Sequence, residues 1–282
     1  MFLPSDLAEA VHMSSDFQPQ GPAPGRRGID WGDEADHGSL VLREAQDADE
    51  MRALYRLRGL CFRGSADASD EDSHDDGCTH LWIGRPGGPP LATLRARHHA
   101  DAASLGAGYS AGFFDLAPMA AQPGTSLEIG RLCLHPRVAP GAAMRLVWRG
   151  VARLRAEAGA RRLIGCTSLQ GGAVERHDAL LAYLAARHLG PVASRPRAWA
   201  TMAHRFSAAA RRAPERRPAM PTILRYYLSQ GGWVSDELAR DRDLDTCVLF
   251  TCVELDAMPP ARRRLIQALA TPPGMSLNTD RA

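Results

Sequence analysis

The 282-residue sequence contains no lysine, so every one of its 34 basic residues is arginine. This absence excludes a lysine nucleophile and a Schiff-base intermediate. Abundant arginine suits the recognition of phosphate or carboxylate, because the guanidinium group offers a planar, bidentate fork. A GC-rich genome explains the same bias more simply, since its codons favour Arg, Ala, Gly and Pro.

CxxC pairs are absent, because the cysteines are scattered along the chain, which argues against a zinc knuckle and a redox dithiol. We therefore expect no metal site and interpret the cysteines as buried, reduced thiols. The six residues are Cys61, Cys78, Cys133, Cys166, Cys247 and Cys252.

Long apolar runs are also missing. No stretch reaches the roughly 18 apolar residues that a membrane span needs, and the N-terminus lacks the basic flank and apolar core of a secretory signal. We expect a cytoplasmic protein. With 45% hydrophobic and 23% charged residues, the chain can bury a substantial core.

The composition changes along the chain. Residues 1–38 are rich in Pro, Gly, Ser and Asp and show no periodicity, so they are predicted to be disordered. A single folded domain is predicted over residues 39–256, followed by a C-terminal helix and tail over residues 257–282.

Alternating and helical patterns within that domain predict a mixed α/β sheet with helices on both faces. Strands are expected within residues 39–45, 80–85, 90–99, 127–137, 161–169 and 245–255. Helices are expected within residues 47–62, 141–159, 175–190 and 221–232.

The strand at residues 127–137, LEIGRLCLHPR, carries two charges where a strand interior makes charge costly. Residues three apart in a regular strand point to opposite faces, so Glu128 and Arg131 would not share a site. Gly130 suggests a solution, because a glycine inside a strand often marks a β-bulge. We predict a bulge near residues 129–132.

Several separated motifs accompany this strand. They are Arg58-x-x-x-Phe62, DEDSHDDGCTHL from Asp70, FDLAP from Phe114, LEIGRLCLHP from Leu127, GCTS from Gly165, PTILRYYLSQGG from Pro221, and the late Asp241 and Thr246. Together, in order and spacing, they resemble the acetyltransferase-like (GNAT) superfamily, specifically its acyl-carrier-protein-dependent ornithine N-acyltransferases, which are related to acyl-homoserine lactone synthases. The resemblance covers roughly residues 40–255.

The resemblance implies a GNAT-like, mainly antiparallel central sheet with a bulge in its central strand. It also implies transfer of a 3-hydroxy fatty acyl chain from acyl carrier protein to the α-amine of ornithine, the first step of ornithine-lipid synthesis. The amine would attack the thioester directly. No bound cofactor is expected.

Glu128 is the expected base, with Arg131 beside it in the catalytic strand. A strand carboxylate next to a dry pocket can have its pKa raised by desolvation, so it could accept the amine's proton directly or through water. A salt bridge to Arg131 or Arg95 is the alternative interpretation of the same residue.

The acidic loop before the second strand is ordinarily read as solvated charge. Its match to the family implies an ion-pair cluster that shapes the site and receives the charged groups of the amino acid, formed by Asp72, Asp75, Arg58, Arg95 and Arg131. His80 is expected either to bind substrate or to be a strand-end histidine bonded to backbone. Buried packing is favoured over a nucleophilic role for Cys133 and Cys166.

Coenzyme-A-using members of the superfamily cradle pyrophosphate on a Gln/Arg-x-x-Gly-x-Gly/Ala loop at a helix N-terminus. Here Val138 stands at the first position, and Pro140 removes a backbone donor. This favours the phosphopantetheine arm of acyl carrier protein over coenzyme A. The residues expected to contact the acyl donor are Leu132, Cys133, Gly141 and Ala143.

Basic residues flank this region, and acyl carrier proteins and anionic bilayers are both acidic partners that such a surface attracts. A solvated surface is the alternative, given a formal net charge of only +2. No motif for nucleic acid accompanies the arginines. They are Arg137, Arg145, Arg149, Arg153, Arg161, Arg162 and those within residues 195–217.

Two other functions stay open. An acyl-homoserine-lactone-synthase-like enzyme, or one acting on another amino acid, would keep the chemistry and change the acceptor. A non-catalytic protein that binds acyl carrier protein, or lies peripherally on the inner face of the cell membrane, would keep only the fold. Convergence of the charged residues on one cleft is the feature that separates enzyme from binding module.

Overall fold

The computed structural model describes residues 40–258 and 260–270, so the predicted disordered extension and residues 271–282 of the predicted C-terminal helix and tail lie outside the described residues. The chain divides into two compact units. The first consists of Met1–Ala96, Arg131–Glu157 and Arg264–Ala282, and the second of Arg97–Gly130 and Ala158–Arg263. The main sheet of the chain has eight strands in the order β1-β2-β3-β5-β6-β10-β9-β8, and β4 and β7 form a separate pair.

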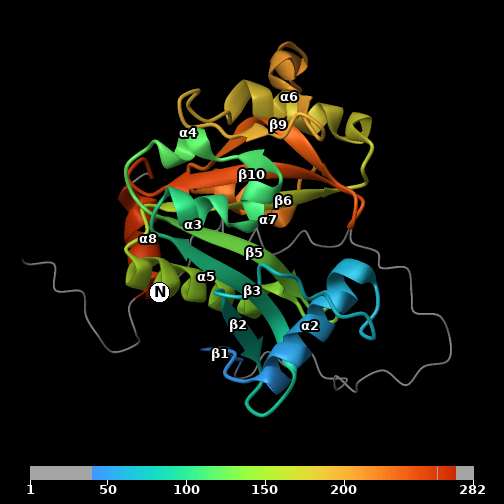
Figure 1. Ribbon diagram of the computed structural model, residues 1–282, viewed down its shortest axis with the longest axis vertical. Coiled ribbons are helices and arrows are strands. Elements are labelled where there is room, and N and C mark those ends of the chain that lie inside the picture. The colour runs from blue at the N-terminus through green and yellow to red at the C-terminus, as the bar shows by residue number, and fades with distance from the viewer. Residues whose placement is uncertain (1–39, 259, 271–282) are drawn as a thin grey trace, which may run out of the picture. The chain divides into compact units, whose positions relative to one another are not determined.

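The first unit contains an antiparallel meander. Figure 1 shows β1, β2 and β3 in sequential order, and their register pairs Leu42 with Ile83 and His80 with Arg95. The C-terminal part of β5 and two helices complete the unit. The elements are β1 (Val41–Glu44), α2 (Ala48–Arg63), β2 (Thr79–Gly84), β3 (Pro90–His99), β5 (Ser126–Leu134) and α5 (Pro140–Ala158).

Local sequence signals define the ends of α2. The side chain of Asp47 accepts a hydrogen bond from the Glu50 backbone N–H, which satisfies one of the open donors of the first turn. At the other end Gly64 adopts φ 72°, a left-handed conformation that glycine reaches without steric cost. These caps place the helix as its sequence predicts.

The helices of the first unit pack against opposite faces of the meander. A side chain at Gly150 of α5 would lie 2.4 Å from a terminal methyl group of Leu81, so glycine at this position lets the helix pack closely on β2. His80 precedes Leu81 and therefore faces the other way, as does its cross-strand partner Arg95. The charged residues thus lie on the face that α5 leaves open.

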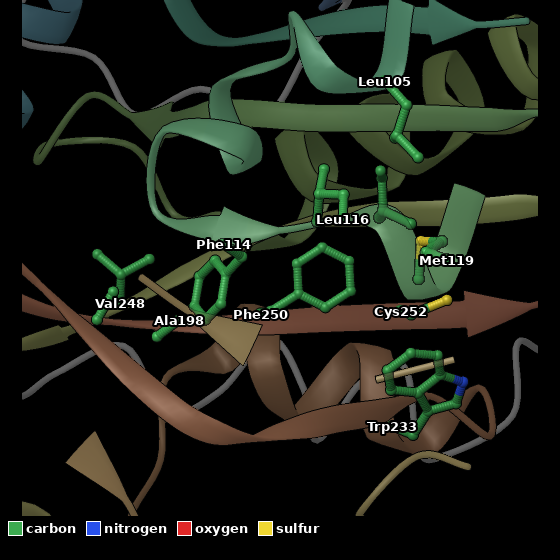
Figure 2. Packing of buried hydrophobic residues seen from close by; sticks show 11 residues of the cluster. Leu105, Phe114, Leu116, Met119, Ala198, Trp233, Val248, Phe250 and Cys252 are labelled. Carbon is green, nitrogen blue, oxygen red and sulfur yellow. The ribbon is translucent and has the colours of Figure 1, made fainter. Parts of the chain in front are cut away.

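The second unit holds the other strands and most of the short helices. One of its core clusters packs Phe114, Trp233 and Phe250 together (Figure 2). The elements are α3 (Ala102–Gly106), η1 (Tyr109–Gly112), β4 (Phe114–Asp115), α4 (Ala117–Ala120), β6 (Arg162–Gln170), η2 (Val174–His177), α6 (Asp178–Arg187), β7 (Arg197–Ala198), β8 (His204–Arg205), η3 (Ser207–Arg212), α7 (Thr222–Ser229), β9 (Trp233–Asp241), β10 (Thr246–Glu254) and α8 (Pro260–Ala270).

Strand β10 explains why this unit has helices on both faces of its sheet. Val248 and Phe250 pack into the cluster that contains residues of α3 and α4, whereas Cys247 and Leu249 pack into the cluster that contains residues of α6 and α7. A strand buried on both faces reads as a continuous apolar run, which is the pattern of TCVLFTCV. The predicted mixed sheet with helices on both sides is confirmed.

Strand β9 was not among the predicted strands. Its sequence, WVSDELARD, carries acids that hide the apolar alternation, yet Asp236 and Glu237 are buried. Arg195 lies 3.6 Å from Asp236, and the Arg205 side chain donates to Glu237. These ion pairs let a charged segment occupy a buried strand.

Strand β5 departs from regular geometry within the predicted interval, although not at the predicted residue. Arg131 has φ 50°, in the left-handed region that costs a non-glycine residue of the order of 1–3 kcal/mol, whereas Gly130 lies outside that region. The parallel register of β5 with β6 covers only Ser126–Glu128.

No helix among the described residues is long and apolar enough to cross a bilayer.

Candidate active site

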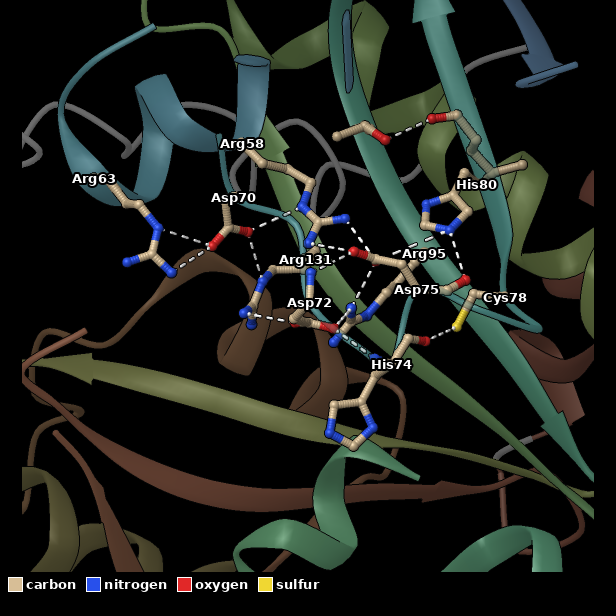
Figure 3. Close-up of polar contacts among 12 residues, drawn as sticks. Arg58, Arg63, Asp70, Asp72, His74, Asp75, Cys78, His80, Arg95 and Arg131 are labelled. Atoms are coloured by element: carbon tan, nitrogen blue, oxygen red, sulfur yellow. Dashed lines mark hydrogen bonds and ion pairs between the residues drawn. The ribbon is translucent and has the colours of Figure 1, made fainter. Parts of the chain in front are cut away.

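Six charged residues of the first unit form a cluster of mutual ion pairs, which we call the Arg–Asp cluster (Figure 3). It comprises Arg58 of α2, Asp70, Asp72 and Asp75 of the loop that follows α2, Arg95 of β3, and Arg131 of β5. Of the residues predicted from sequence, the structure brings Arg58, Asp72, Asp75, Arg95 and Arg131 together.

Arg58 holds the centre of the cluster. Its Nε donates to Asp70 Oδ2 at 3.0 Å, and its two terminal nitrogens donate to the two oxygens of Asp75 at 2.7 and 3.1 Å. The residue is 1% exposed. Such a bidentate, fully buried contact fixes the loop against α2.

Arg95 and Arg131 close the cluster from the sheet. Arg95 donates to Asp72 at 2.5 Å and to Asp75 at 2.7 Å. Arg131 donates from Nε to Asp70 at 2.8 Å and from a terminal nitrogen to Asp72 at 2.9 Å. These two contacts hold the side chain of the left-handed residue, so its backbone strain is offset by ion pairing.

The three carboxyl groups share one electrostatic situation. Burial raises the pKa of each, but the neighbouring guanidinium groups oppose this and keep the pKa of Asp70, Asp72 and Asp75 below the ordinary value. They are ionised at neutral pH, and Arg63 adds a fourth guanidinium group by donating to Asp70 at 3.0 Å. Asp72 has the most exposed carboxylate of the three, at 24%.

His80 lies beside the cluster. Its Nε2 is 3.2 Å from the backbone oxygen of Asp75, and burial lowers its pKa, so the ring is neutral at neutral pH and donates to that carbonyl. This geometry matches the strand-end histidine of the sequence interpretation.

Glu128 has a different set of partners, all in the second unit. Its Oε2 accepts hydrogen bonds from His99 Nε2 at 2.9 Å and from the Tyr109 backbone at 3.1 Å, and its Oε1 accepts from the Ser110 backbone at 2.7 Å. The predicted alternative, a salt bridge from Glu128 to Arg131 or Arg95, is therefore wrong.

The expected rise in the pKa of Glu128 is also wrong. Burial does raise it, but hydrogen bonds from His99 and Ser110 outweigh burial and leave the pKa below the ordinary value. The group is a buried carboxylate, 5% exposed and ionised at neutral pH. Desolvation was visible in the sequence pattern, whereas the three donors come from residues 18 to 29 positions away.

Gly108 makes the approach to Glu128 possible. A side chain at this position would lie 2.5 Å from Glu128 Oε2 and 2.9 Å from His99 Cε1. Glycine therefore lets the 108–110 backbone turn its N–H groups onto the carboxylate. Its role in this contact was not visible from sequence.

The residues predicted to meet the acyl donor differ in accessibility. Leu132 and Gly141 are partly exposed, whereas Cys133 and Ala143 are buried. Burial raises the pKa of Cys133 well above its usual value, so it is a neutral thiol and its expected packing role fits. Pro140 opens α5, where proline is well accommodated.

Some of the arginines predicted to form a basic surface are buried or paired with acidic residues. Arg162 is 6% exposed and donates to backbone carbonyls. Arg153 pairs with Glu157, and Arg161 pairs with Asp256, so both are locally neutralised. Arg145 remains exposed.

Among the described residues, no group of three or more His, Cys, Asp or Glu side chains could hold a metal ion.

Comparisons with known proteins agree with this architecture. Residues 54–149 match the family model described as an acetyltransferase (GNAT) domain. Over 244 residues the chain is 31% identical to an L-ornithine N(alpha)-acyltransferase of Rhodobacter capsulatus, covering 80% of this chain and 93% of that protein.

Two solved structures are similar at lower identity. One is FeeM, an N-acyl amino acid synthase from uncultured soil microbes, with a TM-score of 0.44, 12% identity, and coverage of 82% of this chain and 97% of that chain. The other is BjaI, a CoA-dependent acyl-homoserine lactone synthase, with a TM-score of 0.43, 11% identity, and coverage of 79% and 83%.

Proposed function

Because this chain belongs to the L-ornithine N(alpha)-acyltransferase family of GNAT-type acyltransferases, we propose that it acylates the α-amine of ornithine with a 3-hydroxy fatty acyl chain carried by acyl carrier protein. The product is lyso-ornithine lipid. The chain is an acyltransferase and its activity is N-acyl transfer; the acceptor, the donor and the base are the parts that this proposal adds.

The reaction is direct attack on the thioester. The neutral amine nitrogen forms a bond to the carbonyl carbon, the carbon–sulfur bond breaks, the amine's surplus proton goes to a base, and the departing thiolate takes up a proton. The buried Cys133, whose thiol stays protonated, does not support a covalent acyl-enzyme.

The buried, hydrogen-bonded carboxylate of Glu128 is the observation that supports this mechanism. An ionised carboxylate inside the protein is costly unless hydrogen bonds stabilise it, and here three donors do so. A group that is kept deprotonated at neutral pH can take the proton that the attacking amine must lose. We place Glu128 in this role, acting directly or through a neighbouring group.

The Arg–Asp cluster stabilises the first unit. Its charges are mutually paired and mostly buried, so it holds the acidic loop, β3 and the C-terminal part of β5 together. We assign Asp72, the member with the most exposed carboxylate, to contact with a charged group of the substrate.

Acyl carrier protein is the donor that the helix start of α5 favours. Pro140 removes one backbone N–H from the first turn, where a coenzyme A pyrophosphate would need donors. Arg145 on the same helix and Arg137 just before it are exposed and attract an acidic carrier.

A peripheral membrane position is part of the proposal, because an N-acylated amino acid partitions into lipid. Val192 and Trp199 are exposed apolar side chains, 78% and 45%, close in sequence to the basic residues within 195–217. Sedimentation with anionic and neutral vesicles measures this; equal recovery in both supernatants would contradict it.

One experiment tests the reaction. The purified protein is incubated with 3-hydroxyacyl carrier protein and a panel of amino acids, and products are identified by mass spectrometry, with 3-hydroxyacyl coenzyme A as a parallel donor. We expect acyl-ornithine with the carrier protein as the better donor. Acylation of another amine, or faster transfer from coenzyme A, would overturn the acceptor or the donor respectively.

A further inference from the structure

The second unit contains a cavity of about 220 Å³, and Glu128 is not among its lining residues. Its walls come from the end of β3, α3, α4 and the segment after it, and the starts of β5 and β6. The lining residues that matter here are His99, Ala102, Leu105, Gln122, Ser126 and Arg162.

Two charged residues line the cavity: Asp101, exposed at the start of α3 where its carboxylate accepts from the Ser104 backbone, and the buried Arg162. The partners of the Arg162 guanidinium group among the described residues are all backbone carbonyls: Met119 at 3.1 Å, Gln122 at 3.3 Å, and Gly124. Its Nε has no hydrogen-bond partner there. A buried cation held only by neutral dipoles is costly, and an anion in the cavity would offset that cost.

His99 connects the cavity wall to Glu128. The ring lines the cavity, and its Nε2 lies 2.9 Å from Glu128 Oε2, which assigns the Nε2 proton to this hydrogen bond. Its Nδ1 is buried and has no hydrogen-bond partner among the described residues. The wall formed by Arg162 therefore suits an anion, and the wall formed by His99 connects the cavity to the Glu128 carboxylate.

The size of the cavity selects the ligand class. At about 30 Å³ per water molecule, the volume corresponds to roughly seven waters. It lies below the range of roughly 300–1,000 Å³ for pockets that take drug-sized ligands. A small polar molecule fits it, and a fatty acyl chain does not.

We infer that this cavity binds the acceptor amino acid, with the substrate carboxylate on Arg162 and its amine directed toward the His99–Glu128 pair. The inference rests on the proposed function and names its acceptor site. The substrate ammonium gives one proton to that pair before attack, and the second proton, which the nitrogen loses as the amide bond forms, goes to the departing thiolate. The Arg–Asp cluster cannot fill the carboxylate-binding role as simply, because its arginines are already paired with its aspartates.

A pair of neighbouring substitutions tests the site without touching Arg162 or His99. Ala102 lines the cavity and is exposed at the start of α3, whereas the next residue, Ala103, is equally exposed but is not part of the lining. We expect Ala102→Trp to raise the KM for ornithine tenfold or more and to weaken ornithine binding measured by calorimetry. Ala103→Trp should change neither, and the KM for acyl carrier protein should stay the same in both.

The carboxylate contact has its own test. Ornithinamide keeps the shape of ornithine and lacks its negative charge, so the wild type should prefer ornithine in binding by tenfold or more. In Arg162→Gln this preference should approach one. If Arg162→Gln does not fold, because its contacts to Met119 and Gln122 are lost, the Ala102→Trp comparison decides alone.

Failure of this inference is distinguishable from failure of the proposed function. Acyl-ornithine formation with an unchanged KM and unchanged binding in Ala102→Trp would reject the cavity and leave the reaction standing. Binding of ornithine that Ala102→Trp abolishes, without acylation of any amine, would reject the reaction and leave the cavity standing.

Discussion

His99 and Glu128 form a buried pair whose nitrogen and oxygen lie 2.9 Å apart, with side chains only 1% and 6% exposed. A carboxylate in such a place is stabilised or destabilised almost entirely by its hydrogen bonds. The pair therefore controls how readily Glu128 accepts a proton.

Removing His99 should raise the pKa of Glu128, because burial would then outweigh the remaining backbone donors. A base works only when ionised, so activity appears above its pKa and is lost as pH falls through it. In His99→Ala we expect lower kcat and a low-pH limb of kcat/KM displaced upward by about one pH unit or more. The measurement is a pH–rate profile. His98→Ala is the matched control, since its side chain is exposed, and equal profiles in both variants would contradict the prediction.

Glu128→Gln should reduce acyl transfer by roughly 10²- to 10⁴-fold, because the amide cannot accept the amine's proton. Its NH2 group also turns toward a backbone N–H, so a loss of about 1–3 kcal/mol in the free energy of unfolding accompanies it. Single-turnover rates and urea unfolding of the same preparation separate the two effects. Wild-type turnover in a folded variant would remove Glu128 as the base.

Gly108→Ala should impair catalysis through a steric effect, since its methyl group would meet Glu128 Oε2 at 2.5 Å. The residues must shift, and the backbone donors of Tyr109 and Ser110 move with them. Gly112→Ala is the control, because no atom lies within 4 Å of a side chain there. We expect kcat to fall at least tenfold in the first variant and to change little in the second; equal activities would show that this close approach is unimportant.

Asp70→Asn should destabilise the first unit strongly. Asp70 accepts from Arg58, Arg63 and Arg131, and its neutralisation leaves buried positive charge without a partner. Breaking a buried ion pair costs about 3–5 kcal/mol. Denaturant unfolding should show this loss, whereas Asp76→Asn in the exposed part of the same loop should stay within about 0.5 kcal/mol of the wild type. A comparable effect of both changes would mean that the cluster adds nothing specific.

The same cluster should make the protein acid-labile. Its carboxyl groups have a lower pKa in the folded chain than the value of about 3.9 in the unfolded chain, so they stabilise the fold above that value. This stabilisation is lost as pH falls below about 4 toward the folded pKa values. We expect Tm to drop steeply between pH 5 and pH 3, with a shallower drop in Asp70→Asn. A Tm independent of pH in that range would contradict the ion-pair interpretation.

Sequence patterns were sufficient for the elements whose periodicity is undisturbed. α2 has its cap at Asp47, β10 reads as an apolar run, and both lie where they were predicted. Strand β9 was not predicted, because its acidic residues interrupt the apolar alternation. These acids can be buried because Arg195 and Arg205 form ion pairs with them. Local propensity does not contain such non-local partners.

The sequence by itself marked the strand that carries Glu128 and Arg131, because charge inside a strand is rare enough to mark a site. The resemblance to a known family added Arg58, Asp72, Asp75 and Arg95, whereas Asp70 was not predicted as part of the cluster. Tertiary structure alone decided their partners. It put the strand's left-handed residue at Arg131, directed backbone N–H groups onto Glu128, and paired that carboxylate with His99. A pKa depends on which donors arrive in space, and that information lies in the fold rather than in the spacing of residues along the chain.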